Sequence, residues 1–155
     1  MRISILSDTH GLLRPEVLPL LRGSDHILHC GDVGDIAILE SLSAIAPVTA
    51  IRGNIDTRGP CAALPAMEVV TLGDLSFYML HNLHDLDLDP AAAGFAAVLS
   101  GHSHQPLIRH QKSVLYLNPG SCGPRRFRLP ITYAEIFLTQ NNQLEARIFD
   151  LPVPL

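Results

Sequence analysis

The chain has few cysteines, little net charge and no long apolar run. Its cysteines, Cys30, Cys61 and Cys122, are odd in number and unevenly spaced, which argues against a disulfide framework. The net charge of -4 argues against a long nucleic acid held in a basic channel. No apolar run approaches the ~18 residues of a membrane span, and Asp8 interrupts any N-terminal signal peptide. We therefore expect one domain, residues 1–155, in the reducing cytoplasm, with no membrane partner.

Hydrophobic residues make up 47% of the chain and fall into short segments with strand or helix periods. In the first half, strands are predicted at 1–6, 25–30 and 48–51, and helices at 15–22 and 35–46. The second helix has Asp35 as its expected N-cap and Pro47 as its stop. This half therefore reads as strand–helix–strand units.

Hairpins replace this alternation in the second half. The predicted strands are 68–71 with 75–80, 107–110 with 114–117, 131–139 with 144–150, and 96–99. A weak, alanine-rich helix is predicted at 90–94, and the segment 57–65 is expected to be a loop because it is rich in Gly and Pro. The two halves together predict an α/β fold of two mixed sheets stacked face to face, with helices outside.

Polar motifs end six of the predicted strands. They are Asp8-Thr9-His10, Gly31-Asp32, Gly53-Asn54, His81-Asn82, Gly101-His102-Ser103-His104 and Asn118-Pro119-Gly120-Ser121. Loops at strand ends converge on an open crevice, so these side chains are expected to meet. The first five motifs supply three oxygen donors and four imidazoles, enough for two adjacent divalent ions without a thiolate. Such a donor set suits manganese, iron or zinc and is typical of two-metal hydrolases of phosphate esters.

Each motif alone also has an ordinary structural explanation. A Gly-Asp pair is usually a turn, and a His-x-His pair after a strand is often structural. The ordered combination of motifs, each at a strand end, favours the binuclear site.

The chain resembles the calcineurin-like metallophosphoesterases, and among them the small single-domain bacterial and archaeal phosphodiesterases. The retromer's phosphoesterase-like subunit shares their fold. The resemblance extends from Met1 to about Phe149 and implies a four-layer α-β-β-α sandwich of two mixed sheets flanked by helices. The ligand set that it implies for one metal is Asp8, His10 and His104, with Asp32 bridging to a second metal held by Asn54, His81 and His102.

The resemblance also implies a reaction and its cofactors. Two divalent ions, expected to be Mn²⁺, with Zn²⁺, Fe²⁺ and Ni²⁺ also compatible, would hold a bridging hydroxide that attacks a small phosphodiester in line. The residues expected to act in catalysis are Asp32, Asn54 and His81. Asn54 and Arg125 are expected to bind substrate, although a solvated loop is an alternative role for Arg125 and its neighbours. Assembly into a homo-oligomer is also compatible with the sequence.

Two positions depart from the pattern of the relatives. Many relatives have a histidine that protonates the leaving group at the position of Ile55 in this chain. Hydrolysis of esters with poor leaving groups should therefore be slowed most. Relatives commonly read His-Gly-His where this chain has His81-Asn82-Leu83-His84. His81 is the favoured ligand because it directly follows a predicted strand, and His84 is the alternative.

Three classes of function compete at this stage: a two-metal phosphoesterase, a binding scaffold that uses the site weakly or not at all, and a nuclease. A scaffold would be expected to lose ligands, whereas every ligand position is filled here. A nuclease would be expected to show a basic surface or an added DNA-binding domain. The small-molecule phosphodiesterase is therefore the favoured hypothesis.

Overall fold

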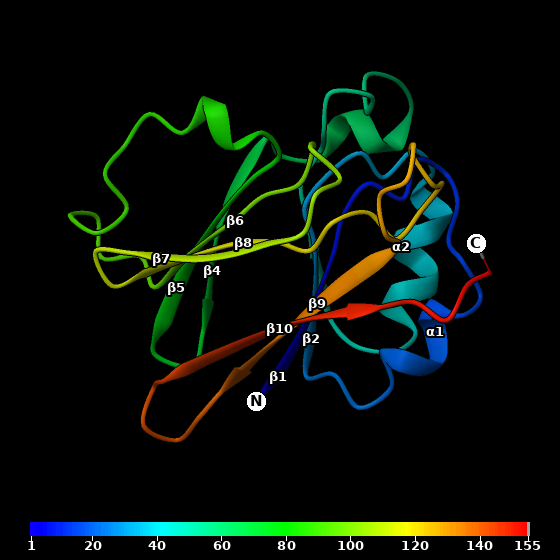
Figure 1. The fold of residues 1–155 in the computed structure, drawn as a ribbon. Coiled ribbons are helices and arrows are strands. Elements are labelled where there is room, and N and C mark those ends of the chain that lie inside the picture. The colour runs from blue at the N-terminus through cyan, green and yellow to red at the C-terminus, as the bar shows by residue number, and fades with distance from the viewer. Residues whose placement is uncertain (155) are drawn as a thin grey trace.

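The computed structural model describes residues 1–154 and contains two stacked five-stranded sheets (Figure 1). The first sheet has the order β10-β9-β1-β2-β3, and the second has the order β4-β5-β6-β8-β7. The strands of the first sheet are β1 (Arg2–Leu6), β2 (His26–His29), β3 (Val48–Ala50), β9 (Thr132–Leu138) and β10 (Leu144–Asp150). Those of the second are β4 (Met67–Leu72), β5 (Leu75–Leu80), β6 (Ala97–Leu99), β7 (Leu107–Gln111) and β8 (Val114–Asn118).

Both sheets are mixed, as predicted. Strands β1, β2 and β3 run parallel, and β9 and β10 add an antiparallel hairpin beside β1. In the second sheet β5, β6 and β8 run parallel between two antiparallel edge strands. The carboxyl ends of the parallel strands therefore lie along one edge of the sandwich, the upper edge in Figure 1.

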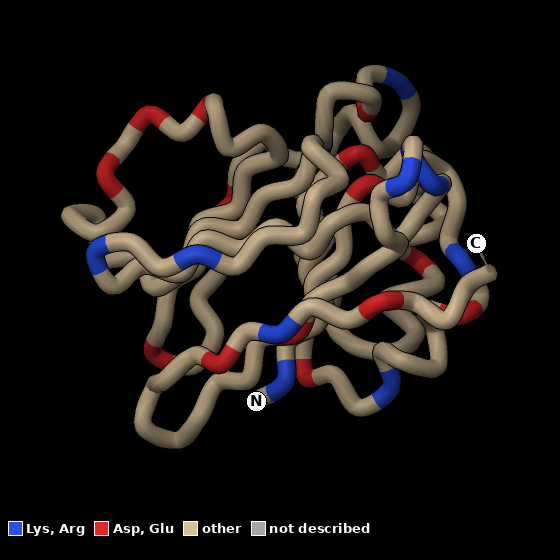
Figure 2. Tube along the Cα trace, in the orientation of Figure 1, with Lys and Arg blue, Asp and Glu red and all other residues tan. Residues whose placement is uncertain are grey.

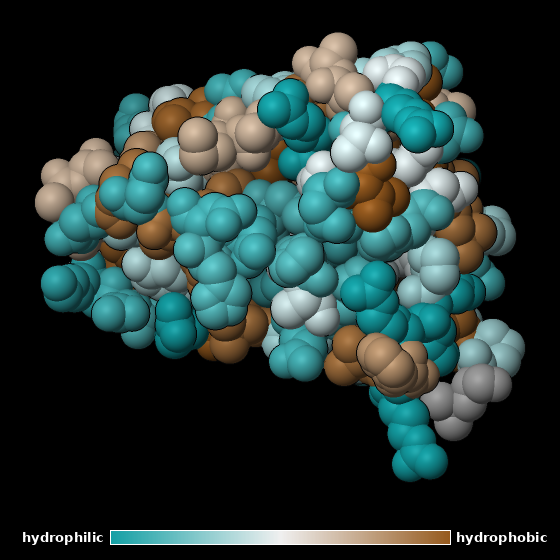
Figure 3. Space-filling model, turned by 90° about the horizontal axis from the view of Figure 1, so that it is seen from above, coloured by the Kyte–Doolittle hydropathy of each residue, from teal (hydrophilic) through white to brown (hydrophobic). Residues whose placement is uncertain are grey.

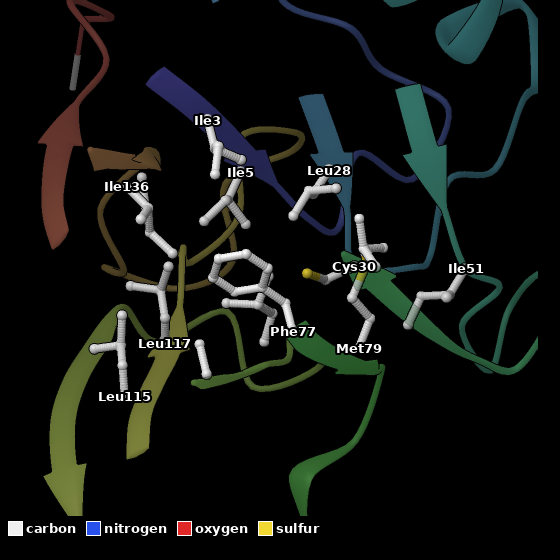
Figure 4. Packing of buried hydrophobic residues seen from close by; sticks show 14 residues of the cluster. Ile3, Ile5, Leu28, Cys30, Ile51, Phe77, Met79, Leu115, Leu117 and Ile136 are labelled. Atoms are coloured by element: carbon white, nitrogen blue, oxygen red, sulfur yellow. The ribbon is translucent and has the colours of Figure 1, made fainter. Parts of the chain in front are cut away.

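The core lies between the two sheets. Ile5 and Leu28 from the first sheet pack with Phe77 and Leu117 from the second, and all four are buried (Figure 4). Burial of one such side chain contributes about 1.5–3 kcal/mol. Alternate residues of β1 and β2 face the opposite way, so the first sheet has a second apolar face.

Helices α1 (Val17–Leu20) and α2 (Ile36–Ser43) cover that outer face. The carboxylate of Asp35 accepts a hydrogen bond from the amide of Ala37, which confirms the predicted N-cap. The predicted loop at 57–65 contains a short 3-10 helix, η1 (Pro60–Ala63). Within residues 1–154, no helix is both long and apolar enough to span a membrane.

The outer face of the second sheet is covered by irregular chain. Segment 83–95 includes the 3-10 helix η2 (Leu83–Asp85), and Leu83 and Phe95 are among the residues that pack on Tyr78 and Tyr116. The helix predicted at 90–94 is wrong, because this segment forms only turns. A segment of five residues is too short to offset helix nucleation, and Gly94 already adopts a φ of 80°.

Candidate metal centre

Seven polar side chains meet at the carboxyl edge of the strands. Six of them form two groups, and within each group the potential ligand atoms all lie within 4.8 Å of one another. The first group is Asp8, His10 and His104, and the second is Asp32, His81 and His102. Asn54 joins the second group, with its Oδ1 3.0 Å from His102 Nδ1. The structure thus brings together all seven residues predicted from the motifs.

The first group is compact and partly buried. The Nε2 atoms of His10 and His104 are 3.2 Å apart. Asp8 Oδ1 lies 3.2 Å from His104 Nε2 and 3.6 Å from His10 Nε2. Burial raises the pKa of Asp8, but His10, His104 and Ser7 hold it well below its ordinary value. Asp8 is therefore an ionised carboxylate facing two imidazole nitrogens.

Asp32 connects the two groups. Its Oδ2 lies 3.2 Å from His81 Nε2 and 3.5 Å from His10 Nε2, so one oxygen contacts a histidine of each group. Burial raises the pKa of Asp32, while His81 and the amide of Ile55 lower it, with a net fall below its ordinary value. This position is the one expected for a carboxylate shared by two cations.

Unsatisfied buried atoms test whether this donor set fits metal ions. Asp8 Oδ1 and His81 Nε2 are buried without a hydrogen-bond partner among residues 1–154, and both face the cluster. Such an atom costs about 1–3 kcal/mol when it is left unpaired. The His10 and His104 nitrogens also face each other at 3.2 Å, which is explained if both lone pairs are directed at a cation. The residues present therefore fit divalent ions.

The backbone at the site is unusual. Five of the seven candidate ligands have a φ in the left-handed region: Asp8 (56°), His10 (46°), Asp32 (54°), His102 (69°) and His104 (58°). Such conformations cost about 1–3 kcal/mol each and persist where the surrounding structure fixes them, often at functional sites. The strain is concentrated on the residues that the motifs predict as ligands.

Two glycines allow the ligand loops to approach closely. A Cβ at Gly53 would lie 2.0 Å from Asp32 Oδ1, and one at Gly101 would lie 2.0 Å from Ser7 Oγ. Any side chain at either position would push the Asp32 or Asp8 loop outwards. The glycines beside the ligands are thus required by contact between loops.

Asp56 holds these loops together, a role that the sequence reading missed. Its buried carboxylate accepts hydrogen bonds from the amides of Val33, Gly34 and Gly53 at 2.9–3.0 Å. Its oxygens are therefore engaged within the protein rather than facing a substrate. In the sequence, this role was indicated only by the position of Asp56 directly after Gly53-Asn54-Ile55.

His29 supports the site from beneath. Its Nδ1 accepts the Gly31 amide at 3.2 Å, so Nε2 carries the proton and donates to Thr9 Oγ1 at 3.0 Å. The Thr9 hydroxyl in turn donates to the carbonyl of Val33. Burial lowers the pKa of His29 to about 4, which keeps the ring neutral. His29 therefore supports the loops that carry Asp8 and Asp32 and belongs to neither metal group.

Three further residues with reactive or charged side chains lie outside both metal groups. His84 is exposed on η2, outside both groups, and lines a cavity of about 430 Å³ that includes His102. Arg125 donates to the carbonyl of Leu129 and lines a different cavity with Asp150, so the structure does not bring it to the cluster. Cys122 is fully buried, and burial raises its pKa to about 12, which disfavours a nucleophilic role.

An open cavity of about 290 Å³ adjoins the second group. Residues that line it include Arg52, Asn54, Met67, His81, Asp85 and His102. The face above the site is largely hydrophilic, with separate hydrophobic residues exposed on it (Figure 3). A small ligand can therefore reach the cluster from solvent.

Comparison with known proteins identifies the family. A family model described as the calcineurin-like phosphoesterase superfamily domain matches residues 1–141. The chain belongs to this superfamily. A protein named as a probable metallophosphoesterase of Methanocaldococcus jannaschii is 33% identical, and the match covers 97% of this chain and 82% of the relative.

Two further phosphoesterase-fold proteins extend the comparison. A phosphodiesterase of the same archaeon is 26% identical, and the match covers 79% of this chain and 84% of the relative. The structure of Vps29 from Cryptosporidium parvum superimposes with a TM-score of 0.76 and 17% identity, covering 96% of each chain. This likeness concerns the fold, which is the fold class predicted from the sequence. Family membership and the named relatives support a metal-dependent hydrolase.

Proposed function

We propose that the protein is a binuclear metal-dependent phosphodiesterase acting on small phosphodiesters. The observation that carries this proposal is the position of Asp32, whose Oδ2 contacts a histidine of each candidate metal group. Family membership and a relative named as a phosphodiesterase support the same reaction class. The three buried free cysteines fit the cytoplasmic location predicted from the sequence.

The chain's own residues have distinct roles in this proposal. Asp8, His10 and His104 would hold one ion, His81, His102 and Asn54 the other, and Asp32 both. Such ions supply an acidified water and positive charge beside the phosphate. We propose manganese because the donors are oxygen and imidazole only. Asn54 adds a neutral oxygen, so the site keeps net positive charge for an anionic substrate.

The proposed substrate is small and its leaving group is good. The cavities beside His102 are open and the chain has a net charge of -4, features that suit a small diester better than a long polyanion. Ile55 cannot donate a proton to a departing alkoxide. Aryl or similarly acidic leaving groups should therefore be favoured.

A binding scaffold is the second candidate function. The similarity in fold to Vps29 is the observation in its favour. The complete set of seven donor residues favours the enzyme, because a scaffold has no need of strained, partly buried ligands.

Metal content and hydrolysis of bis(4-nitrophenyl) phosphate in Asp32→Asn test the proposal. Asparagine keeps the shape and can still accept the Ile55 amide, but it removes the shared charge. We expect loss of both metals and of nearly all activity, whereas the exposed turn variant Asp74→Asn should match the unmodified protein. Full metal content and activity in Asp32→Asn would overturn the proposal.

A further inference from the structure

The loop between β8 and β9 exposes an aromatic ring between two arginines. Phe127 is 88% exposed, the largest value among the exposed large hydrophobic residues of the described chain. Its φ of 53° is uncommon for a bulky residue. Arg126 and Arg128 flank it, and Figure 2 shows basic residues gathered on this loop. Neither burial nor backbone preference accounts for a phenylalanine at this position.

This tip shares a cavity with the candidate metal centre. The cavity has a volume of about 500 Å³, and its lining includes His102, Ser103, Gln105, Arg126, Phe127 and Arg128. His102 belongs to the second metal group. A flat apolar ring, two guanidinium groups and a candidate metal ligand therefore border one space.

The base of the loop is fixed to the site. A Cβ at Gly123 would lie 2.4 Å from the carbonyl oxygen of Thr9, between two candidate ligands, so the loop rests on that backbone. Arg14 donates to the carbonyl of Gly123 at 2.8 Å, and Arg125 closes the loop by donating to Leu129 at 3.1 Å. Arg125 thus positions the tip, while its neighbours project from it.

We propose that Arg126, Phe127 and Arg128 form a recognition lip for phosphate esters that carry a planar aromatic or heteroaromatic ring. The ring would stack on Phe127, and the guanidinium groups would bind phosphate oxygens. The inference rests on the proposed function and narrows its substrates to aromatic or nucleoside phosphodiesters. Stacking of this kind changes affinity by roughly tenfold.

Calorimetric binding to the manganese-loaded protein tests the lip without turnover. Each of two pairs of probes compares a phosphate that carries an aromatic ring with one that lacks it: adenosine 5′-monophosphate with ribose 5-phosphate, and phenyl phosphate with ethyl phosphate. We expect the ring-bearing member to bind about tenfold more tightly in at least one pair. The pair that shows the preference identifies a nucleoside or a simple aryl group as the ring.

Variants of the exposed ring separate stacking from general stability. Phe127→Ala and Phe127→Leu should abolish the ring preference, Phe127→Trp should retain it, and Val69→Ala, an exposed residue on β4, should change nothing. Arg126→Gln should weaken ring-bearing and ring-free phosphates by similar factors. Equal binding within both pairs, or a preference unchanged in Phe127→Ala, would overturn the lip.

The two proposals fail in different ways. If the protein binds aromatic phosphates through Phe127 but hydrolyses no diester, the proposed lip stands and the proposed phosphodiesterase activity is wrong. If it hydrolyses diesters in a manner dependent on Asp32 but shows no ring preference, the activity stands and the lip is wrong.

Discussion

The Nδ1–H of His81 donates a hydrogen bond of 2.7 Å to the carbonyl oxygen of Cys30. Because a carbonyl can only accept, this bond fixes the ring and directs Nε2 toward the cluster. His81 follows β5 and Cys30 follows β2, so the bond also joins the two sheets at the site. Histidine ligands commonly donate their other N–H to a backbone carbonyl in this way.

This bond predicts that His81, rather than His84, is the ligand. His81→Ala should reduce metal content from two ions toward one per chain and lower activity by about 100-fold or more, since ligand loss exceeds the 10–100-fold cost of an outer partner. His84→Ala, which changes an exposed residue, should retain both ions. Elemental analysis of both variants measures this, and the opposite pattern would assign the ligand to His84.

Removal of metal should destabilise the fold. Ions that bind only the folded state add about 2.7 kcal/mol when present at 100 times their Kd, which corresponds to roughly 5–10 °C in Tm for a chain of this size. Chelation should abolish hydrolysis and lower Tm. Added Mn²⁺ should restore Tm and give a higher rate of hydrolysis than added Zn²⁺ or Ni²⁺, although Zn²⁺ and Ni²⁺ should raise Tm at least as much because they bind such donors more tightly. Activity that survived prolonged dialysis against chelator would exclude the metal mechanism.

The grouping of the candidate ligands could be predicted from the sequence because each of them follows a strand whose hydrophobic pattern is clear. The carboxyl ends of neighbouring parallel strands lie at the same edge of a sheet, so Asp8 and Asp32 could be placed together from the sequence alone. The outer layer formed by 83–95 could not be predicted, since Leu83 and Phe95 have no periodic spacing and are held by tertiary packing. Asp56 was missed because its role depends on amides from loops distant in the sequence.

His29 should make the stability of the metal-free protein depend on pH. Its folded pKa of about 4 is below the ordinary value of 6.5, because burial disfavours the charged ring. Above about pH 6.5 the ring is neutral in both the folded and the unfolded state, and the protein has its full stability. As the pH falls toward 4, only the unfolded state takes up the proton, and the free energy of unfolding falls by a total of about 3 kcal/mol. Urea unfolding with chelator present, compared between the unmodified protein and His29→Gln, measures this. A slope between pH 4 and 6.5 that is unchanged in the variant would contradict the assignment.

Ile55 should make hydrolysis depend steeply on the leaving group. The side chain is 41% exposed and its amide donates to Asp32 Oδ1 at 3.0 Å, so the residue lies at the edge of the site without filling a core. Replacement with histidine should therefore be tolerated and should place an imidazole near the ester. Ile55→His should accelerate hydrolysis of alkyl diesters by up to ~100-fold and leave that of aryl diesters little changed, because only poor leaving groups need the proton.

The variant Ile55→Gln is the control, because glutamine is polar but cannot act as an acid. Rates for substituted phenyl and alkyl diesters give the dependence on leaving-group pKa for all three proteins. A shallow dependence in the unmodified protein would assign the proton to another group, and His84, which lines the cavity beside His102, would then be the first residue to replace.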